Sequence, residues 1–210
     1  MKCRFALSYR DIEEICKIRG VMLDHATVQR LVIRFIPLLD KRFRRRKKNV
    51  SGSWRMDETY IKVSGKWKYL YRAVDKYGAT IDFLLRAKRD KVAAKAFFKK
   101  AIRQNGKPEK VNIDKSGANT YALADLNTEY ELEKASKIKI RQNKYMNNRI
   151  EGDHRFIKKI TRPMLGFKSF SSARITLAGI ETVHMIRKNQ LITNKNNQNN
   201  YEKFTSLIAA

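Results

Sequence analysis

Three acidic residues occupy positions where carboxylates can do chemistry. Asp57 lies inside a predicted strand, Asp114 ends another predicted strand, and Glu151 lies in the first turns of a predicted helix. Carboxylates at strand ends and at a helix start can converge on one edge of a sheet, where the active sites of parallel sheets tend to lie. Three converging acids repel one another, so they need cations or raised pKa values.

Hard oxygen ligands of this kind suit magnesium or manganese. Two such ions about 4 Å apart can activate a nucleophile and stabilise the leaving oxygen in an in-line displacement at a phosphodiester. The plainer interpretation of any one of these acids is a buried ion pair or a strand-end cap, and spacing alone favours it. Four nearby acids fit the pattern as well: Glu58, Asp75, Asp82 and Asp153.

The charge of the chain indicates a polyanionic partner. Its 210 residues include 47 Lys and Arg against 20 Asp and Glu, a formal net charge of +27 at pH 7, with 42% hydrophobic residues to build a core. Nucleic acid is the first candidate, since phosphate neutralisation supplies most non-specific affinity. An anionic membrane surface is the alternative, but we find no convincing basic amphipathic helix, lipid anchor or apolar run of about 18 residues.

Bases share the predicted helix face of Glu151. Glu151, Arg155 and Lys158 follow the i, i+4, i+7 rule. Surface pairing of Glu151 with Arg155 would contribute only a few tenths of a kcal/mol. A face divided by task, with Glu151 toward metal ions and the two bases toward DNA phosphate, stays open as the alternative, and His154, one turn from Glu151, lies near the site or DNA. Gly152 costs this helix about 1 kcal/mol relative to Ala, for no reason visible in the sequence.

Residues 1–40 predict a helix-turn-helix. A capping box at Ser8 and Asp11 starts the first helix, Gly20 ends it, Asp24 caps the second and Pro37 closes it. An ordinary helical hairpin fits this spacing about equally well, and the basic charge favours a DNA reader. The reader helix would expose His25, Thr27, Gln29 and Arg30.

A basic run, KRFRRRKK at 41–48, contains Arg44, Arg45 and Arg46. It reads as a solvated linker, over 41–53, which can also track a phosphate backbone. Cys3 and Cys16 have no partner at metal-ligand spacing, which disfavours zinc, and two thiols fit a reducing cytoplasm. The first residues hold too short an apolar stretch for a signal peptide.

The pattern then changes from helix to strand. Segments 54–63, 67–75 and 80–87 combine aromatic and branched residues with short turns, which predicts an antiparallel meander. The expected elements that follow are a helix at 91–105, a strand at 110–114, a helix at 120–126, a strand at 137–142, the helix of Glu151, and a last helix capped by Ser171 or Ser172 and ending at Arg187. This order predicts an α/β fold with a mixed five-stranded sheet flanked by helices. The polar tail at 191–210 is expected to be disordered.

Together these segments resemble a known family. MDETYIKVSGKWKYLYRAVDKYGATIDFLLRAKRD, NIDKSG, NNRIEGDHRFIKK and RPMLGFKSFSSARITLAGIETVHMIRKNQ resemble the DDE transposases of bacterial insertion sequences, specifically family six, over about residues 8–190. The resemblance implies a ribonuclease H-like integrase core at 54–190 and an N-terminal helix-turn-helix. It also implies DNA transposition with two Mg²⁺ (or Mn²⁺) ions and replicative cointegrate formation.

The resemblance also implies roles for single residues. Asp57, Asp114 and Glu151 match the catalytic, metal-binding acids in chain order, and Lys158 matches the DNA-gripping base of the D-D-E-x6-K/R signature. In the implied mechanism a 3′-hydroxyl is freed at the element end and attacks a target phosphodiester. The implied partners are terminal inverted repeats, target DNA and at least one further copy of the chain, near the nucleoid of a bacterial cytoplasm and away from membranes.

The chain departs from the family pattern in three places. The family has about one more helix before the position of Ser8. Asp114 and Glu151 are separated by 36 residues, two more than usual, which places a small loop insertion at 127–137. Gly152 replaces a residue that is more often Gln in the family. The short N-terminus leaves open a catalytically silent, truncated transposase that only binds DNA. A nuclease or resolvase of the same fold is a third alternative.

Overall fold

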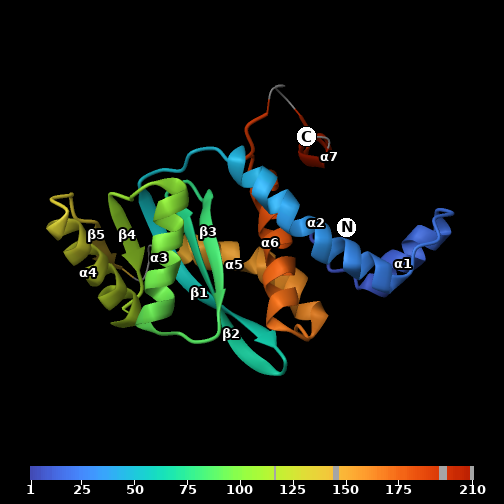
Figure 1. Cartoon of the computed structure of the whole chain (residues 1–210), viewed down its shortest axis with the longest axis horizontal. Helices are drawn as coiled ribbons and strands as arrows, with labels where there is room; N and C mark the ends of the chain where they lie inside the picture. The colour runs from blue at the N-terminus through green and yellow to red at the C-terminus, as the bar shows by residue number, and fades with distance from the viewer. Residues whose placement is uncertain (116, 144–146, 194–197, 209–210) are drawn as a thin grey trace. The chain divides into compact units, whose positions relative to one another are not determined.

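A computed structural model describes residues 1–115, 117–143, 147–193 and 198–208. The chain divides into two compact units (Figure 1). The sheet unit comprises residues 49–61 and 67–155, and the helical unit comprises residues 1–48, 62–66 and the chain from Phe156 onward.

The sheet unit is built on five strands. They are β1 (Ser53–Val63), β2 (Lys66–Asp75), β3 (Thr80–Arg86), β4 (Lys110–Ile113) and β5 (Lys139–Gln142). They lie in the order β3-β2-β1-β4-β5, with β2 antiparallel to β3 and with β4 parallel to both β1 and β5. Ser64 and Gly65 both have positive φ, which suits the two-residue turn between β1 and β2. The mixed five-stranded sheet that the sequence predicts is confirmed.

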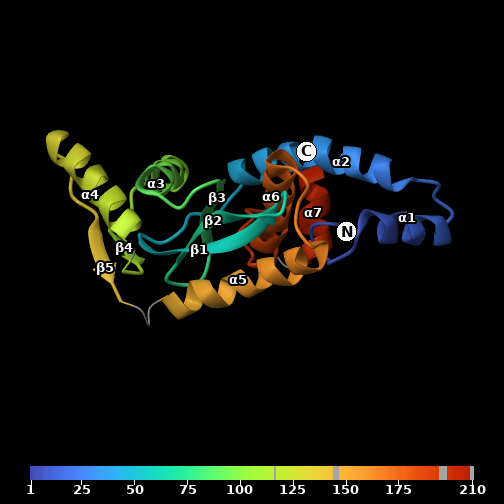
Figure 2. The same ribbon diagram turned by 90° about the horizontal axis from the view of Figure 1, so that it is seen from below.

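Helices cover both faces of this sheet. Figure 2 shows the sheet between α3 (Lys91–Asn105) on one side and, on the other, the part of α5 (Asn148–Thr161) that belongs to the sheet unit, residues 148–155, with α4 (Gly117–Leu132) beside β4 and β5. The apolar stripe that the sequence of α3 predicts is buried at Ala94, Phe97, Phe98 and Ala101 and partly buried at Ile102. These residues join Trp54, Tyr71 and Leu123 in the core between the sheet, α3 and α4. The sequence places α3 at its observed residues because period and caps agree there.

The helical unit contains α1 (Tyr9–Ile18), α2 (His25–Arg45), the end of α5, α6 (Phe170–Arg187) and α7 (Asn200–Ile208), with a 3₁₀ turn at Arg162–Met164. The predicted capping box is present, since Asp11 N–H donates to Ser8 Oγ at 3.0 Å and Ser8 N–H donates to Asp11 Oδ2 at 2.6 Å. Asp24 caps α2 by accepting from Thr27 N–H at 2.9 Å. Two helices joined by a turn are therefore observed, as both the DNA-reading and the plain hairpin interpretations require.

The expectation that Pro37 ends the second helix is wrong. Helix α2 continues through Pro37 to Arg45, so the first five residues of the predicted linker are helical. Proline removes one intrahelical hydrogen bond, but Leu39 and Phe43 are buried beyond it. Asp40 and Arg44 also pair at 2.8 Å across one turn. Packing on the far side of the proline overrides its breaking tendency.

Two other boundaries differ from expectation. Helix α6 is capped by Ser169, whose Oγ accepts from Ser172 N–H at 3.1 Å, and not by Ser171 or Ser172. Helix α4 extends from Gly117 to Leu132, so half of the expected loop insertion at 127–137 is helical. Ser169, Ser171 and Ser172 lie within three positions of one another, and local sequence does not show which of them caps α6.

The tail expected to be disordered contains α7. Asn199 caps this helix by accepting from Glu202 N–H at 2.9 Å, and Leu207 is buried. The Arg42 guanidinium donates to the carbonyl oxygens of Leu207 and Ile208 at 3.0 and 2.8 Å, at the helix end where backbone carbonyls lack partners. Residues 194–197 and 209–210 of that tail lie outside the described residues.

Candidate active site

The parallel pairing of β1 with β4 brings two of the predicted acids together. Ser53 pairs with Lys110 and Arg55 with Asn112. The same register, continued by two residues, places Asp57 level with Asp114, which directly follows β4. Oxygens of Asp57, Glu58 and Asp114 lie within 4.8 Å of one another. We call these three carboxylates the acidic cluster.

Glu58 is the member of the acidic cluster that the sequence left among the open alternatives. Its side chain is only 4% exposed. Asn119 Nδ2 donates to Glu58 Oε1 at 3.0 Å, and Arg89 Nη2 donates to Glu58 Oε2 at 3.2 Å. The adjacent acids in MDETY are the available signal, and pattern alone does not choose between them, although alternation along a strand places neighbours on opposite faces.

Glu151, the third predicted acid, is not one of the three residues of that cluster. It is exposed in the first turn of α5. Its negative charge nevertheless helps to raise the pKa of Asp57, so it acts on the same site.

The first turns of α5 are attached to the sheet. Arg72 of β2, fully buried, donates to Asp153 Oδ2 at 2.7 Å. His154 is 4% exposed, and its Nδ1 lies 3.7 Å from Asp57 Oδ2. Ile150 is fully buried. These contacts fix the helix that carries Glu151.

Two carboxylates of the acidic cluster have raised pKa values. Burial raises the pKa of Asp57 to about 7, and the charges of Glu58, Asp114 and Glu151 add to this rise against a backbone hydrogen bond from Glu58. Burial also raises the pKa of Glu58, although Arg89 and Asn119 oppose it. Carboxylates that resist ionisation in this way are stabilised by a cation. The donor set therefore fits a hard divalent metal ion.

The other acids near these strands have structural partners. Asp75 accepts from the backbone N–H groups of Ser51, Tyr77 and Ala79 at 2.9 to 3.0 Å, and so holds the turn after β2. Asp82 pairs with Lys100 at 2.7 Å. Both match the plainer interpretation of an acid as a cap or an ion pair.

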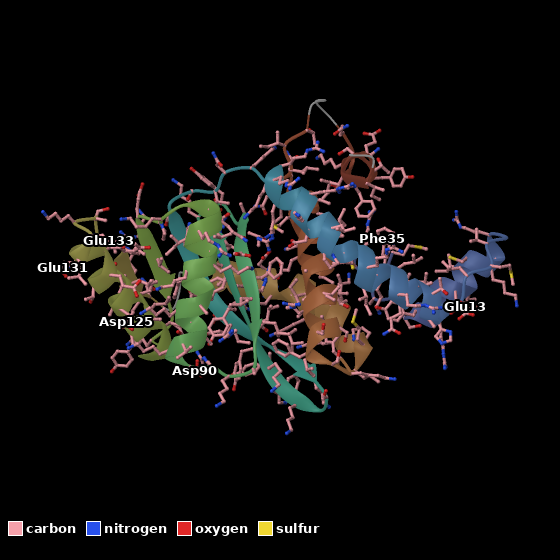
Figure 3. All side chains as sticks on the ribbon, viewed as in Figure 1. Glu13, Phe35, Asp90, Asp125, Glu131 and Glu133 are labelled. Atoms are coloured by element: carbon pink, nitrogen blue, oxygen red, sulfur yellow. The ribbon has the colours of Figure 1, made fainter. Side chains whose placement is uncertain are left out.

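Acids on α4 form a ladder with lysines of α3. Figure 3 labels Asp125 on α4 and Asp90 at the start of α3. Asp125 lies 2.9 Å from Lys91 and 3.3 Å from Lys95, and Glu129 lies 2.9 Å from Lys95 and 3.0 Å from Lys99. These exposed pairs contribute little each, and they supply matched controls for the site.

The predicted DNA contacts have varied surroundings. Arg155, Gln29, Arg30 and Arg45 are exposed, Lys158 is half-buried, and His154 is buried beside Asp57. The Thr27 hydroxyl bonds Asp24 and Arg30 at 2.7 and 2.9 Å. Arg44 pairs with Asp40, and Arg46 donates to the carbonyl oxygens of Ile192 and Ser206.

Among the described helices, none has the length and apolarity needed to cross a membrane.

Comparison with solved structures defines the class of fold. The catalytic core domain of HTLV-2 integrase in complex with magnesium, in its dimeric form, superposes with a TM-score of 0.51 at 19% identity, over 74% of this chain and 97% of that chain. The sheet unit with its flanking helices is thus a ribonuclease H-like core of the integrase kind.

Sequence comparison is more specific. The family model DDE_Tnp_IS240, a DDE domain, matches residues 51–190. The transposase for insertion sequence element IS257 in transposon Tn4003 of Staphylococcus aureus is 44% identical over 186 residues, 88% of this chain and 80% of that protein. The transposase for insertion sequence-like element IS431mec of Staphylococcus aureus strain Mu50 is 43% identical over the same shares. The chain belongs to the DDE transposases of insertion sequences.

Proposed function

We propose that this protein cleaves DNA at the ends of an insertion sequence and transfers the freed strands into target DNA. The observation that carries the proposal is the acidic cluster, in which parallel pairing sets Asp57 level with Asp114 and burial raises the pKa of Asp57 to about 7. The names of the relatives support the substrate class, since both are transposases of insertion sequences.

Asp57, Asp114 and Glu151 are the residues that we propose to hold two magnesium or manganese ions. Bound there, such ions would supply charge stabilisation to an in-line displacement at phosphorus. Asp57 and Asp114 lie within the acidic cluster. Glu151 is exposed, so its side chain can change rotamer at little cost, while Arg72 and His154 hold its helix in place. In this proposal Glu58 supports the site without being a ligand.

We propose that DNA is bound by basic and polar side chains outside the acidic cluster. Helix α2 presents Gln29 and Arg30 beside Thr27, and Arg155 is exposed one turn after Glu151. The remaining candidates are Lys158, His154 and the three arginines at 44–46. The functional division is a DNA-binding region at 1–40, a basic connection at 41–53 and the catalytic core at 54–190. Because two element ends must be held together, the working form is at least a dimer in the bacterial cytoplasm, close to the nucleoid.

The test compares strand transfer with DNA binding in the same protein. Asp114→Asn is expected to abolish magnesium-dependent strand transfer from labelled DNA carrying the element's inverted repeats, and to leave the gel shift of that DNA nearly intact. Asp125→Asn makes the same chemical change in the exposed α4 ladder and is expected to keep activity. Full strand transfer by Asp114→Asn would overturn the site assignment. A wild-type chain that shifts the DNA and never cleaves it would establish the silent, DNA-binding alternative instead.

A further inference from the structure

Arg89 contacts the acidic cluster from the loop between β3 and α3. One nitrogen of its guanidinium, Nη2, lies 3.2 Å from Glu58 Oε2 and 3.1 Å from Asp114 Oδ2. Its side chain is 34% exposed, so the group lies at the mouth of the cluster rather than in the core. A cation of the protein itself therefore touches one of the carboxylates proposed to bind metal.

Glu58 gives Arg89 a fixed anchor. The buried Glu58 carboxylate uses one oxygen for Arg89 and the other for Asn119, which is itself fully buried. Asn119 Nδ2 also lies 3.5 Å from Asp114 Oδ1. A buried carboxylate without a cation is strongly unfavourable, so the Glu58–Arg89 pair is expected to persist. Asp114, at 40% exposure, has no such need of its partner.

Charge is distributed accordingly. Burial alone would lower the pKa of Arg89, but attraction to Glu58 and Asp114 outweighs it and raises that pKa. The guanidinium is a permanent cation in this setting. A divalent ion that approaches Asp114 Oδ2 therefore meets a group already bound there.

We propose that Arg89 is a resident counter-cation of the active site, held by Glu58, which a divalent metal ion must displace from Asp114. Arg89 is then a positioning residue: it keeps Asp114 beside Asp57 while no metal is bound, and it weakens metal binding by competition. This inference rests on the proposed function, because it takes Asp114 to be a metal ligand and Glu58 to be the anchor of Arg89.

The experiment measures Mn²⁺ binding to the full chain by calorimetry at pH 8. Arg89→Ala is expected to tighten Mn²⁺ binding by roughly two- to fivefold, the ratio that corresponds to losing a partly exposed ion pair. Lys88→Ala removes the same charge from the neighbouring, exposed position and is expected to bind Mn²⁺ like the wild type. Arg89→Lys, which keeps a cation there, should restore most of the competition.

Unchanged or weaker binding in Arg89→Ala, or an equal gain in Lys88→Ala, would overturn the inference. The side chain offers a second readout, since the Nε–Hε NMR signal of Arg89 should shift when Mg²⁺ is added to the wild type and should stay unchanged in Asp114→Asn. If the wild type binds Mn²⁺, Asp114→Asn does not, and Arg89→Ala equals the wild type, this inference fails while the proposed function stands. A wild type that binds no Mn²⁺ would overturn both.

Discussion

Asp57 gives the metal-free protein an unusual response to pH. The pKa of its carboxyl rises from 3.8 to about 7 on folding, mainly through burial. Between these values the folded chain binds more protons than the unfolded chain, so the free energy of unfolding falls as pH rises from 4 to 7. With a side chain 21% exposed, the loss is roughly 2 to 4 kcal/mol and is complete above pH 7.

Urea denaturation at pH 5 and pH 8, with a chelator present, measures this effect. Asp57→Asn is expected to flatten the dependence on pH, because the amide does not titrate. Asp125→Asn, in the exposed ladder of α3 and α4, is expected to keep the wild-type dependence. An Asp57→Asn protein with the full wild-type slope would show that another group is responsible.

Gly152 is the residue beside Glu151 for which packing gives no reason. A Cβ added there would meet nothing within 4 Å, although the position lies inside α5. Gly152→Ala is therefore expected to stabilise the chain by roughly 0.5 to 1 kcal/mol, because alanine loses less backbone entropy in a helix.

At Gly179 of α6, the change from glycine to alanine is expected to have the opposite effect on stability. A Cβ at Gly179 would lie 2.5 Å from Cys3 Sγ and 2.7 Å from Ile36 Cδ1. Gly179→Ala should destabilise the chain by roughly 1 to 3 kcal/mol through overpacking. Thermal unfolding of both variants separates them, and a Gly152→Ala protein that melts earlier than the wild type would contradict the prediction.

At the scale of elements, α5 depends on a buried ion pair. Arg72 is fully buried and Asp153 is 12% exposed, with 2.7 Å between Nη2 and Oδ2. Asp153→Ala leaves the guanidinium without this partner and is expected to destabilise the chain by about 3 kcal/mol. Replacing both residues, as in Arg72→Met with Asp153→Leu, should recover much of that loss. A double-mutant cycle by urea denaturation checks the coupling, and additive effects would refute it.

Sequence reasoning located most elements and misplaced some of their ends. The limits of α3 are predictable because Asp90 caps its start and Gly106 directly follows its last residue. The end of α2 was mispredicted at Pro37 because proline usually ends a helix. Here the burial of Leu39 and Phe43, which follow Pro37, keeps the chain helical. Helix α7 was missed because the polar composition before it hid a short amphipathic segment ending at the buried Leu207.

Part of the site was predictable from the sequence, because local pattern and strand order place some of its residues. Asp57 and Asp114 stand at strand positions that parallel pairing makes level, so pattern and topology suffice to bring them together. Glu58 and Arg89 were not selected, because their contact joins a strand to a distant loop and no periodicity encodes it. The ladder of α3 and α4 shows that acids of similar sequence character can be purely structural.

The whole molecule carries a charge of +27, which makes any DNA affinity dependent on salt. The logarithm of the association constant is expected to fall linearly with the logarithm of salt concentration. Arg155→Ala should weaken binding and reduce the magnitude of that slope by about 1, as loss of one phosphate contact does. Lys95→Ala, whose amine pairs with Asp125 and Glu129, should leave the slope unchanged. Fluorescence anisotropy at several salt concentrations distinguishes the two variants, and equal slopes would exclude Arg155 as a phosphate contact.

The parallel pairing of β1 with β4 also bears on how the protein folds. Hairpins between neighbouring strands close short loops and form early. The pairing of Ser53 with Lys110 instead closes a loop that contains β2, β3 and α3. Pairing at such separation is slow, because a long loop must close before any contact rewards it. A chain emerging from the ribosome thus has Asp57 long before it has Asp114 beside it. The acidic cluster is therefore assembled only when this one strand pair closes.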